Sequence, residues 1–359
     1  NLMIHLAERG EQAIAITSRT PETELRAALQ SANFVFHLAG VNRPTDDTAF
    51  VTGNVDLTQT ICDILADHRR TAGGGGTPVV YTSSIQAERD NPYGRSKRAA
   101  EQILTNYATA ASAPVRLFRL PNVFGKWARA NYNSVVATFC HNIAKGLDIR
   151  INDPSAPLEL VYVDDVCAAF LELLEALQEP GAAFATAEPV YTTTVGAVAD
   201  AIYGFARSRQ TLLTERVGTG LTRALYSTYL SNLEPASFAY DVPRHGDARG
   251  VFVEMLKTPD CGQFSYFTAG PGITRGEHYH HSKNEKFLVL TGQARFGFRH
   301  IVTNKRYEII ISGGEGRIVE TIPGWTHDIT NIGDQEMVVM LWANEIFERD
   351  RPDTVACKV

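Results

Sequence analysis

The sequence predicts an α/β domain followed by an all-β domain, and three observations carry this prediction. Over residues 1–240, short apolar segments alternate with longer stretches of helical periodicity, which is typical of a Rossmann-like, doubly wound parallel sheet. From Gly250 onward, short alternating segments are separated by glycines, as in a small antiparallel barrel. The chain of 359 residues also exceeds the usual size of one core. We therefore expect domains at 1–240 and 247–359, with residues 237–247 as the linker.

Composition excludes several classes of function. The formal net charge is −6 and the isoelectric point is near 6.0, so no basic footprint for nucleic acid is present. The sequence contains no apolar run of membrane-spanning length and its start does not resemble a signal peptide, which predicts a cytoplasmic protein without a membrane partner. Five cysteines lie scattered without paired spacing and are expected to be reduced thiols: Cys62, Cys140, Cys167, Cys261 and Cys357.

The first residues predict the start of a dinucleotide-binding fold. A helix ends at Gly10, and a strand is expected from Gln12 to Ser18. These match the first helix and second strand of such a fold, whose first strand and glycine-rich turn are then expected just before Asn1, outside this sequence. Ser18 and Arg19 would end the second strand, where a hydroxyl and a guanidinium suit the 2′-phosphate of NADP. We expect NADPH, although a solvated arginine is the alternative.

The next strand is expected from Asn33 to Gly40. It ends in Leu38, Ala39 and Gly40, and small residues there let the backbone approach a cofactor. A long helix follows over residues 50–65, and a strand beginning at Thr77 then brings a run of hydroxyls to its carboxyl end. Ligands bind at that edge of a parallel sheet.

The stretch from Thr82 to Lys97 carries the equipment for moving a proton on or off an alcohol. Tyr93 and Lys97 lie four residues apart on a helix and share one face. A nearby ammonium favours the phenolate, so Lys97 is expected to lower the pKa of Tyr93, while Ser83 or Ser84 holds the substrate oxygen. Of the two serines we choose Ser84. A surface helix pair without function is the alternative.

Beyond this stretch, Pro114–Leu120 is expected to form a further strand. Asn122 follows it and is expected to contact cofactor or substrate. Arg129 lies in a polar loop before an amphipathic helix, which suits a sugar diphosphate or is merely solvated. Asp164 and Asp165 are interpreted as structural residues that satisfy open backbone amides at the start of a helix.

The second half carries a candidate metal site. His278 and His280 point to the same side of a predicted strand, Glu285 follows after a turn, and His327 comes later. Three imidazoles and a carboxylate can bind a first-row divalent metal such as Zn²⁺ and leave positions open. The alternative is a set of hydrogen-bonded core histidines.

Ser-Ser followed by Asn-Pro-Tyr-Gly-Arg-Ser-Lys resembles the active site of the extended short-chain dehydrogenase/reductases. The resemblance implies that Ser84, Tyr93 and Lys97 are catalytic, that Tyr93 and Lys97 also contact the nicotinamide cofactor, and that Leu38–Gly40 and Asn122 line its site. The sugar-nucleotide dehydratases of that family have an Asp-Glu pair where this sequence has Ile85 and Gln86. Dehydration is therefore not expected.

The second half resembles the cupins, through the metal-site residues together with Gly272, Gly292 and Asn331. Asp-Ala-Arg-Gly-Val-Phe-Val-Glu at 247–254 and Arg275-Gly276-x-His278 are similar to segments of the deoxysugar-nucleotide 3,5-epimerases, which are cupins. That resemblance implies that Arg249, Glu254 and Arg275 bind substrate. It makes His278 either the base or a metal ligand.

As a whole, the chain resembles the bifunctional capsule and O-antigen enzymes of the N-acetyl-L-fucosamine pathway. The resemblance implies C3 epimerisation of a UDP-linked 4-keto-6-deoxy-HexNAc by the cupin, then C4 reduction with NADPH to UDP-2-acetamido-2,6-dideoxy-L-talose. Two rivals are a reductase whose cupin only stabilises a dimer and a non-enzymatic NADP or sugar sensor, which would need no proton donor. A homodimer is expected because symmetric dimers are common.

Overall fold

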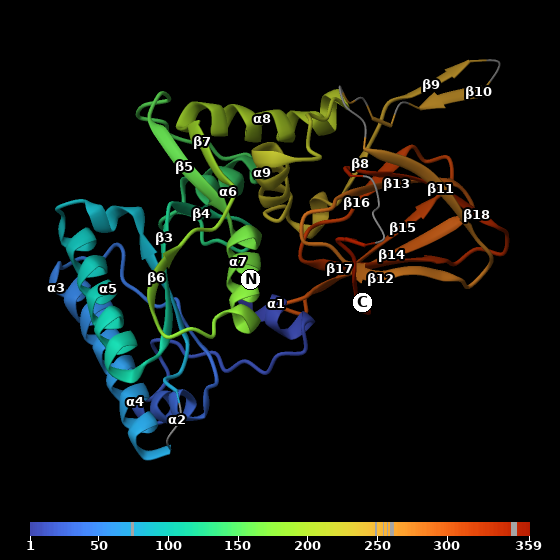
Figure 1. Cartoon of the computed structure of the whole chain (residues 1–359). Coiled ribbons are helices and arrows are strands. Elements are labelled where there is room, and N and C mark those ends of the chain that lie inside the picture. The colour runs from blue at the N-terminus through green and yellow to red at the C-terminus, as the bar shows by residue number, and fades with distance from the viewer. Residues whose placement is uncertain (73–74, 248–249, 254, 257, 259–261, 346–349) are drawn as a thin grey trace. The chain divides into compact units, whose positions relative to one another are not determined.

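The computed structural model describes the whole chain except residues 73–74, 248–249, 254, 257, 259–261 and 346–349. The described residues form two compact units (Figure 1). The first comprises residues 1–123 and 159–192, and the second comprises residues 124–158 and 193–359. The domain boundary expected near residues 240–247 therefore lies inside the second unit.

A four-stranded parallel sheet organises the first unit, in the order β1-β2-β3-β6. Its strands are β1 (Val35–His37), β2 (Val79–Ser84), β3 (Pro114–Leu120) and β6 (Gly181–Ala185). The apolar, β-branched residues of β2 and β3 are buried on both faces, as a central parallel strand requires. The expected parallel sheet is confirmed, and β3 has the predicted bounds.

Helices cover both faces of this sheet (Figure 1). Val79 and Tyr81 pack toward α4 (Leu57–Ala72) and α5 (Pro92–Ala111), whereas Val80 packs toward α7 (Val163–Ala176). This alternation follows from the two-residue period of a strand. The remaining helical segments of this unit are α1 (Leu2–Glu8), α2 (Glu22–Ser31), α3 (Thr48–Phe50), a π-helical turn (Val51–Asp56) and a 3₁₀ turn (Ile85–Glu88).

The strand expected from Gln12 to Ser18 is not formed. Residues 11–17 are irregular and lead into a turn at residues 18–20. A strand requires a neighbour that accepts its backbone hydrogen bonds, and in the described part of the chain no strand pairs with this segment. The apolar residues Ile14 and Ile16 are exposed as a consequence.

The second unit contains helices and most of the β-structure. Its helices are α6 (Val135–Ala144), α8 (Val195–Thr211) and α9 (Gly220–Leu230), with a 3₁₀ turn at Pro235–Ser237. The chain passes between the units within three strands that form a small sheet: β4 (Asn122–Phe124), β5 (Pro157–Tyr162) and β7 (Val190–Thr194).

Two five-stranded antiparallel sheets form the C-terminal part of the second unit, in the orders β11-β18-β13-β16-β8 and β15-β14-β17-β12-β19. The first sheet consists of β8 (Ala239–Asp241), β11 (Gln263–Ala269), β13 (Glu285–Thr291), β16 (Arg317–Glu320) and β18 (Met337–Ala343). The second consists of β12 (Thr274–Tyr279), β14 (Gln293–His300), β15 (Arg306–Ser312), β17 (Trp325–Asn331) and β19 (Val355–Ala356). A separate hairpin joins β9 (Arg244–Asp247) and β10 (Gly250–Val253).

The segment expected to be a linker is partly built into the first of these sheets. Within it, β8 pairs with β16. Next to β8, the buried Glu320 carboxylate contacts both the Arg209 guanidinium of α8 and the Lys286 ammonium of β13. Buried charges of this kind persist only when they are paired. The α8 helix is therefore tied to the sheet by charge as well as by packing.

Two further sequence predictions concern membranes and thiols. Among the described helices, none combines the length and apolar character needed to cross a bilayer. Cys62, Cys140, Cys167 and Cys357 are free thiols. Cys261 lies outside the described residues.

Candidate functional site

The first candidate site lies where β2 ends and α5 begins. The Ser84 side chain accepts a hydrogen bond from the Gln86 amide at 3.2 Å, and it lies beside the Tyr93 side chain. Asn91 caps α5 by accepting from the Gly94 amide at 2.7 Å. A Cβ atom at Gly94 would lie 2.2 Å from the Gln86 carbonyl oxygen. Glycine therefore allows α5 to pack closely enough to place Tyr93 beside Ser84.

Ser83 and Ser84 face opposite sides of the sheet, because successive strand residues do so. The Ser83 hydroxyl donates to Glu101 Oε1 at 2.5 Å. Glu101 in turn accepts two hydrogen bonds from Arg119, at 2.9 and 2.7 Å. Ser83 thus belongs to a buried structural network, whereas Ser84 lies beside Tyr93.

Burial raises the pKa of Tyr93, and the neighbouring Ser84 side chain only partly opposes this rise. The expected net lowering of this pKa is therefore wrong for the chain by itself, because desolvation of the phenolate outweighs the effects that favour the phenolate. The phenol is protonated at neutral pH. A protonated phenol is the form that can donate to a developing alkoxide.

Lys97 is buried one helical turn after Tyr93, and its ammonium donates to the Thr82 carbonyl at 2.8 Å and to the Tyr81 hydroxyl at 3.2 Å. Burial lowers the pKa of Lys97 to about 8, against the opposing charge of Glu101. The two hydrogen bonds to Tyr81 and Thr82 hold the ammonium at the carboxyl end of β2.

Asn54 is a site residue that the sequence analysis missed. It is buried in the π-helical turn, where its Oδ1 accepts from the Val41 amide at 2.7 Å and its Nδ2 donates to the Val41 carbonyl and the Ser96 hydroxyl, each at 2.9 Å. A Cβ atom at Gly40 would lie 2.9 Å from Asn54 Oδ1 and 3.1 Å from Lys97 Nζ. Asn54 therefore fixes the segment after β1 against α5. The signal in the sequence was the amide side chain of Asn54 within an otherwise apolar helical stripe, which indicates a buried polar contact.

The remaining residues predicted to bind cofactor or substrate in this half are solvent-exposed. Leu38 is 45% exposed, Ala39 and Gly40 are also exposed, and Ser18 and Arg19 lie in the exposed turn after residue 17. Asn122 is exposed at the start of β4 and donates to the Glu159 carbonyl at 3.1 Å. Arg129 belongs to the second unit, where its guanidinium lies 5.4 Å from the Tyr132 ring centroid.

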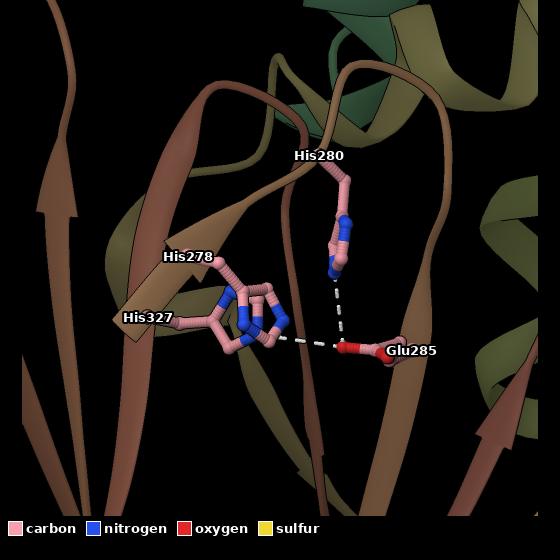
Figure 2. A group of neighbouring side chains, drawn as sticks. All are labelled: His278, His280, Glu285 and His327. Atoms are coloured by element: carbon pink, nitrogen blue, oxygen red, sulfur yellow. Dashed lines mark hydrogen bonds and ion pairs between the residues drawn. The ribbon is translucent and has the colours of Figure 1, made fainter. Parts of the chain in front are cut away.

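The second candidate site brings together His278, His280, Glu285 and His327 (Figure 2). His278 of β12 lies opposite His327 of β17 in the strand register, and Glu285 begins β13. Glu285 Oε2 lies 3.2 Å from His280 Nε2 and 3.4 Å from His327 Nε2. One potential ligand atom from each of the four side chains lies within 4.8 Å of the others.

A β-bulge aims His278 toward this group. The pairing of β12 with β17 shifts register between Gly276 and His278, and Gly276 and Glu277 both have positive φ, at 98° and 57°. The Gly276 carbonyl accepts a hydrogen bond at 2.9 Å from His278 Nδ1. A Cβ atom at Gly276 would lie 2.9 Å from the His327 carbonyl oxygen. The bulge explains why glycine precedes the histidine by two residues.

The donor set fits a divalent cation. His280, Glu285 and His327 are buried and His278 is half-buried. Burial lowers the pKa of His278 to about 4, reinforced by His327 and His280, and burial also lowers the pKa of His327. Although burial alone would raise the pKa of Glu285, contacts with His280 and His327 hold it well below its usual value. Neutral imidazoles with one carboxylate are the ligands of zinc and its neighbours.

Of the three residues that the epimerase resemblance predicts to bind substrate, the structure describes one. Arg275 is exposed on β12, and its guanidinium lies 5.0 Å from the Phe267 ring centroid. Arg249 and Glu254 lie outside the described residues.

Comparison with known proteins gives matches for both halves. Residues 5–184 match the model of the NAD dependent epimerase/dehydratase family, and residues 245–355 match that of the polysaccharide biosynthesis C-terminal domain. A Pseudomonas aeruginosa protein named UDP-2-acetamido-2,6-beta-L-arabino-hexul-4-ose reductase is 55% identical over 360 residues, spanning 100% of this chain and 95% of that protein.

Solved structures agree with these matches. The capsular polysaccharide assembling protein CapF from Staphylococcus aureus is 41% identical, with a TM-score of 0.66, over 100% of this chain and 96% of that one. CapF with the inhibitor 3-isopropenyl-tropolone is 36% identical over the same shares, with a TM-score of 0.60.

The close approach at Gly94 predicts a strict requirement for glycine. Gly94→Ala should lower the free energy of unfolding by about 1–3 kcal/mol, the usual cost of overpacking, because the methyl group meets backbone carbonyls. Gly204→Ala is the matched control, since a Cβ atom in that α8 position meets nothing within 4 Å. The control should gain up to about 1 kcal/mol from helix propensity. Urea denaturation would measure both, and equal stability of the two variants would contradict the packing described.

Proposed function

The chain belongs to the NAD dependent epimerase/dehydratase family, and on that premise we propose that it is an oxidoreductase that uses NADPH to reduce the C4 ketone of a UDP-linked 4-keto-6-deoxy-HexNAc. The observation that carries the proposal is the placement of the Ser84 hydroxyl beside the protonated Tyr93, with the buried Lys97 one helical turn further on. The exposed Ser18 and Arg19, a hydroxyl and a guanidinium, support NADPH over NADH.

In the proposed reduction, Ser84 orients the substrate by donating its hydroxyl proton in a hydrogen bond to the ketone oxygen. NADPH, when bound, supplies the hydride to the carbonyl carbon. Tyr93 gives its phenolic proton to the same oxygen, so that the ketone becomes a secondary alcohol and solvent reprotonates the phenolate. Lys97 keeps a positive charge beside the end of β2, which stabilises the phenolate while it exists.

The proposed substrate and product come from the relatives and from the sequence resemblance. The Pseudomonas protein is named as a reductase of a UDP-linked hexul-4-ose, a sugar with its ketone at C4. CapF is named as a capsular polysaccharide assembling protein. These names support C4 reduction and capsule synthesis, and the sequence resemblance adds UDP-2-acetamido-2,6-dideoxy-L-talose as the product and O-antigen synthesis as a further use. A homodimer and a cytoplasmic location belong to the same proposal.

We also propose that residues 247–359, as a cupin domain, epimerise C3 of the same sugar before reduction. The ketone at C4 acidifies the C3 proton, and reduction would remove that activation, so epimerisation must come first. His278, His280, Glu285 and His327 would hold the cation, and a bound divalent metal such as Zn²⁺ would act as a Lewis acid toward the ketone. His278 is the most accessible of the four, and its lowered pKa keeps it neutral, as either a ligand or a base requires.

The two serines at the end of β2 should behave differently when replaced. Ser84→Ala should lower kcat for NADPH-dependent ketone reduction by about 10²–10³, the usual effect of removing one donor to a developing oxyanion. Ser83→Ala should leave kcat nearly unchanged and reduce thermal stability, because Glu101 loses a buried hydrogen bond. NADPH absorbance and thermal melting measure the two effects. Loss of activity in Ser83→Ala at unchanged stability would mean that the roles are reversed.

The two proposed activities should also be separable. Tyr93→Phe should slow NADPH oxidation by about 10²–10⁴, because the proton donor is lost, yet still exchange the C3 proton of the ketone for solvent deuterium. Glu285→Gln should lose that exchange, because the neutral amide is a poor metal ligand, and still reduce ketone that has already been epimerised. Unimpaired exchange by Glu285→Gln would leave a reductase whose second unit is not an epimerase.

A further inference from the structure

His280 differs from the other members of the proposed metal site in how it is held. His278 and His327 lie within paired strands, and Glu285 begins β13 with its amide donating to Thr321 Oγ1 at 2.9 Å. His280 follows the last residue of β12 and so lies outside its ladder. Its position must therefore be fixed by other contacts.

A C-terminal clasp, defined here as residues 353–358, supplies those contacts. Within it, β19 pairs with β12, so that Ala356 lies opposite His278 and Val355 opposite Tyr279. The Cys357 amide donates to the Glu277 carbonyl at 2.8 Å, next to the bulge. The clasp thus runs along the strand that leads to His280.

Asp353, the first residue of the clasp, accepts hydrogen bonds from the backbone amides that follow His280. Its Oδ1 accepts from the His281 amide at 2.9 Å, and its Oδ2 accepts from the Ser282 and Lys283 amides, both at 2.7 Å. The Ser282 hydroxyl adds a fourth hydrogen bond at 3.0 Å. Three consecutive amides converging on one carboxylate form a rigid anion-binding turn.

The backbone carbonyl of the same Asp353 accepts a hydrogen bond from His280 Nδ1. Nδ1 is therefore occupied by the Asp353 carbonyl, and Nε2 is the ring nitrogen that faces Glu285 Oε2, at 3.2 Å, and the centre of the group (Figure 2). One residue thus anchors the loop through its side chain and orients the ligand through its main chain.

We propose that Asp353 is a positioning residue for the metal centre, acting through His280. The inference rests on the proposed function only in assuming that the four side chains bind a metal. Outer contacts of this kind typically change metal affinity by about 10–100-fold when they are removed. Asp353→Asn nearly preserves the shape of the side chain but turns an amide group toward the backbone N–H donors. The loop is then no longer held, and the main-chain carbonyl of residue 353 no longer stays beside His280 Nδ1.

The first test uses metal-free protein labelled with ¹⁵N-histidine. The wild type should show a slowly exchanging Nδ1–H proton on His280, and Asp353→Asn should lose it. Asp350→Asn removes the same charge from an exposed site three residues away and should behave as the wild type. Asp353→Glu keeps the charge but displaces it, and should give an intermediate result even if the asparagine variant folds poorly. A protected Nδ1–H in both Asp353 variants would overturn the inference.

The second test is titration with Co²⁺, followed by its visible absorption. Asp353→Asn should bind Co²⁺ about 10–100-fold more weakly, with an altered spectrum, while the first unit still reduces already epimerised ketone with NADPH at the wild-type rate. Equal Co²⁺ affinity and spectrum in wild type and Asp353→Asn would overturn the positioning role. If the wild type binds no Co²⁺, the metal centre itself is rejected, and the Nδ1–H measurement alone then decides whether Asp353 orients His280.

Discussion

The close packing of α5 against the turn after β2 is the constraint on which the first site depends. Gly94 allows this packing, Asn91 caps the helix, and the result is that Tyr93 meets Ser84. The same helix places Lys97 in a buried position, where the end of β2 satisfies its ammonium. Each side chain proposed to take part in the reduction is thus attached to one strand end and one helix start, so its geometry does not depend on a long loop.

The second site is built on a different principle. Here three strands contribute side chains directly, and a β-bulge and a C-terminal segment correct the aim of the two histidines that a regular ladder would misplace. The charges complement this geometry, since burial lowers the pKa of His278 and His327 while the histidine neighbours of Glu285 hold its pKa well below the usual value. A buried carboxylate surrounded by neutral nitrogen donors favours a cation over a proton.

Local sequence patterns predicted the parallel sheet, the bounds of β3 and the residues that assemble near Glu285, because strand periodicity and turn residues act over short distances. Other features depended on contacts that no local pattern reveals. Gln12–Ser18 has strand character but lies beside no partner among the described strands, and β8 was assigned to a linker because its partner β16 is distant in sequence. The raised pKa of Tyr93 and the role of Asp353 likewise depend on burial and on tertiary hydrogen bonds.

The most direct test of a shared ketone intermediate is proton NMR of the wild-type protein in deuterated water with the UDP-linked 4-keto-6-deoxy-HexNAc, before and after addition of NADPH. Sequential chemistry predicts that the proton beside the ketone exchanges without NADPH, and that a reduced, deuterium-labelled sugar forms once NADPH is added. Reduction without prior or concurrent exchange would contradict the bifunctional proposal and assign the chain to reduction only.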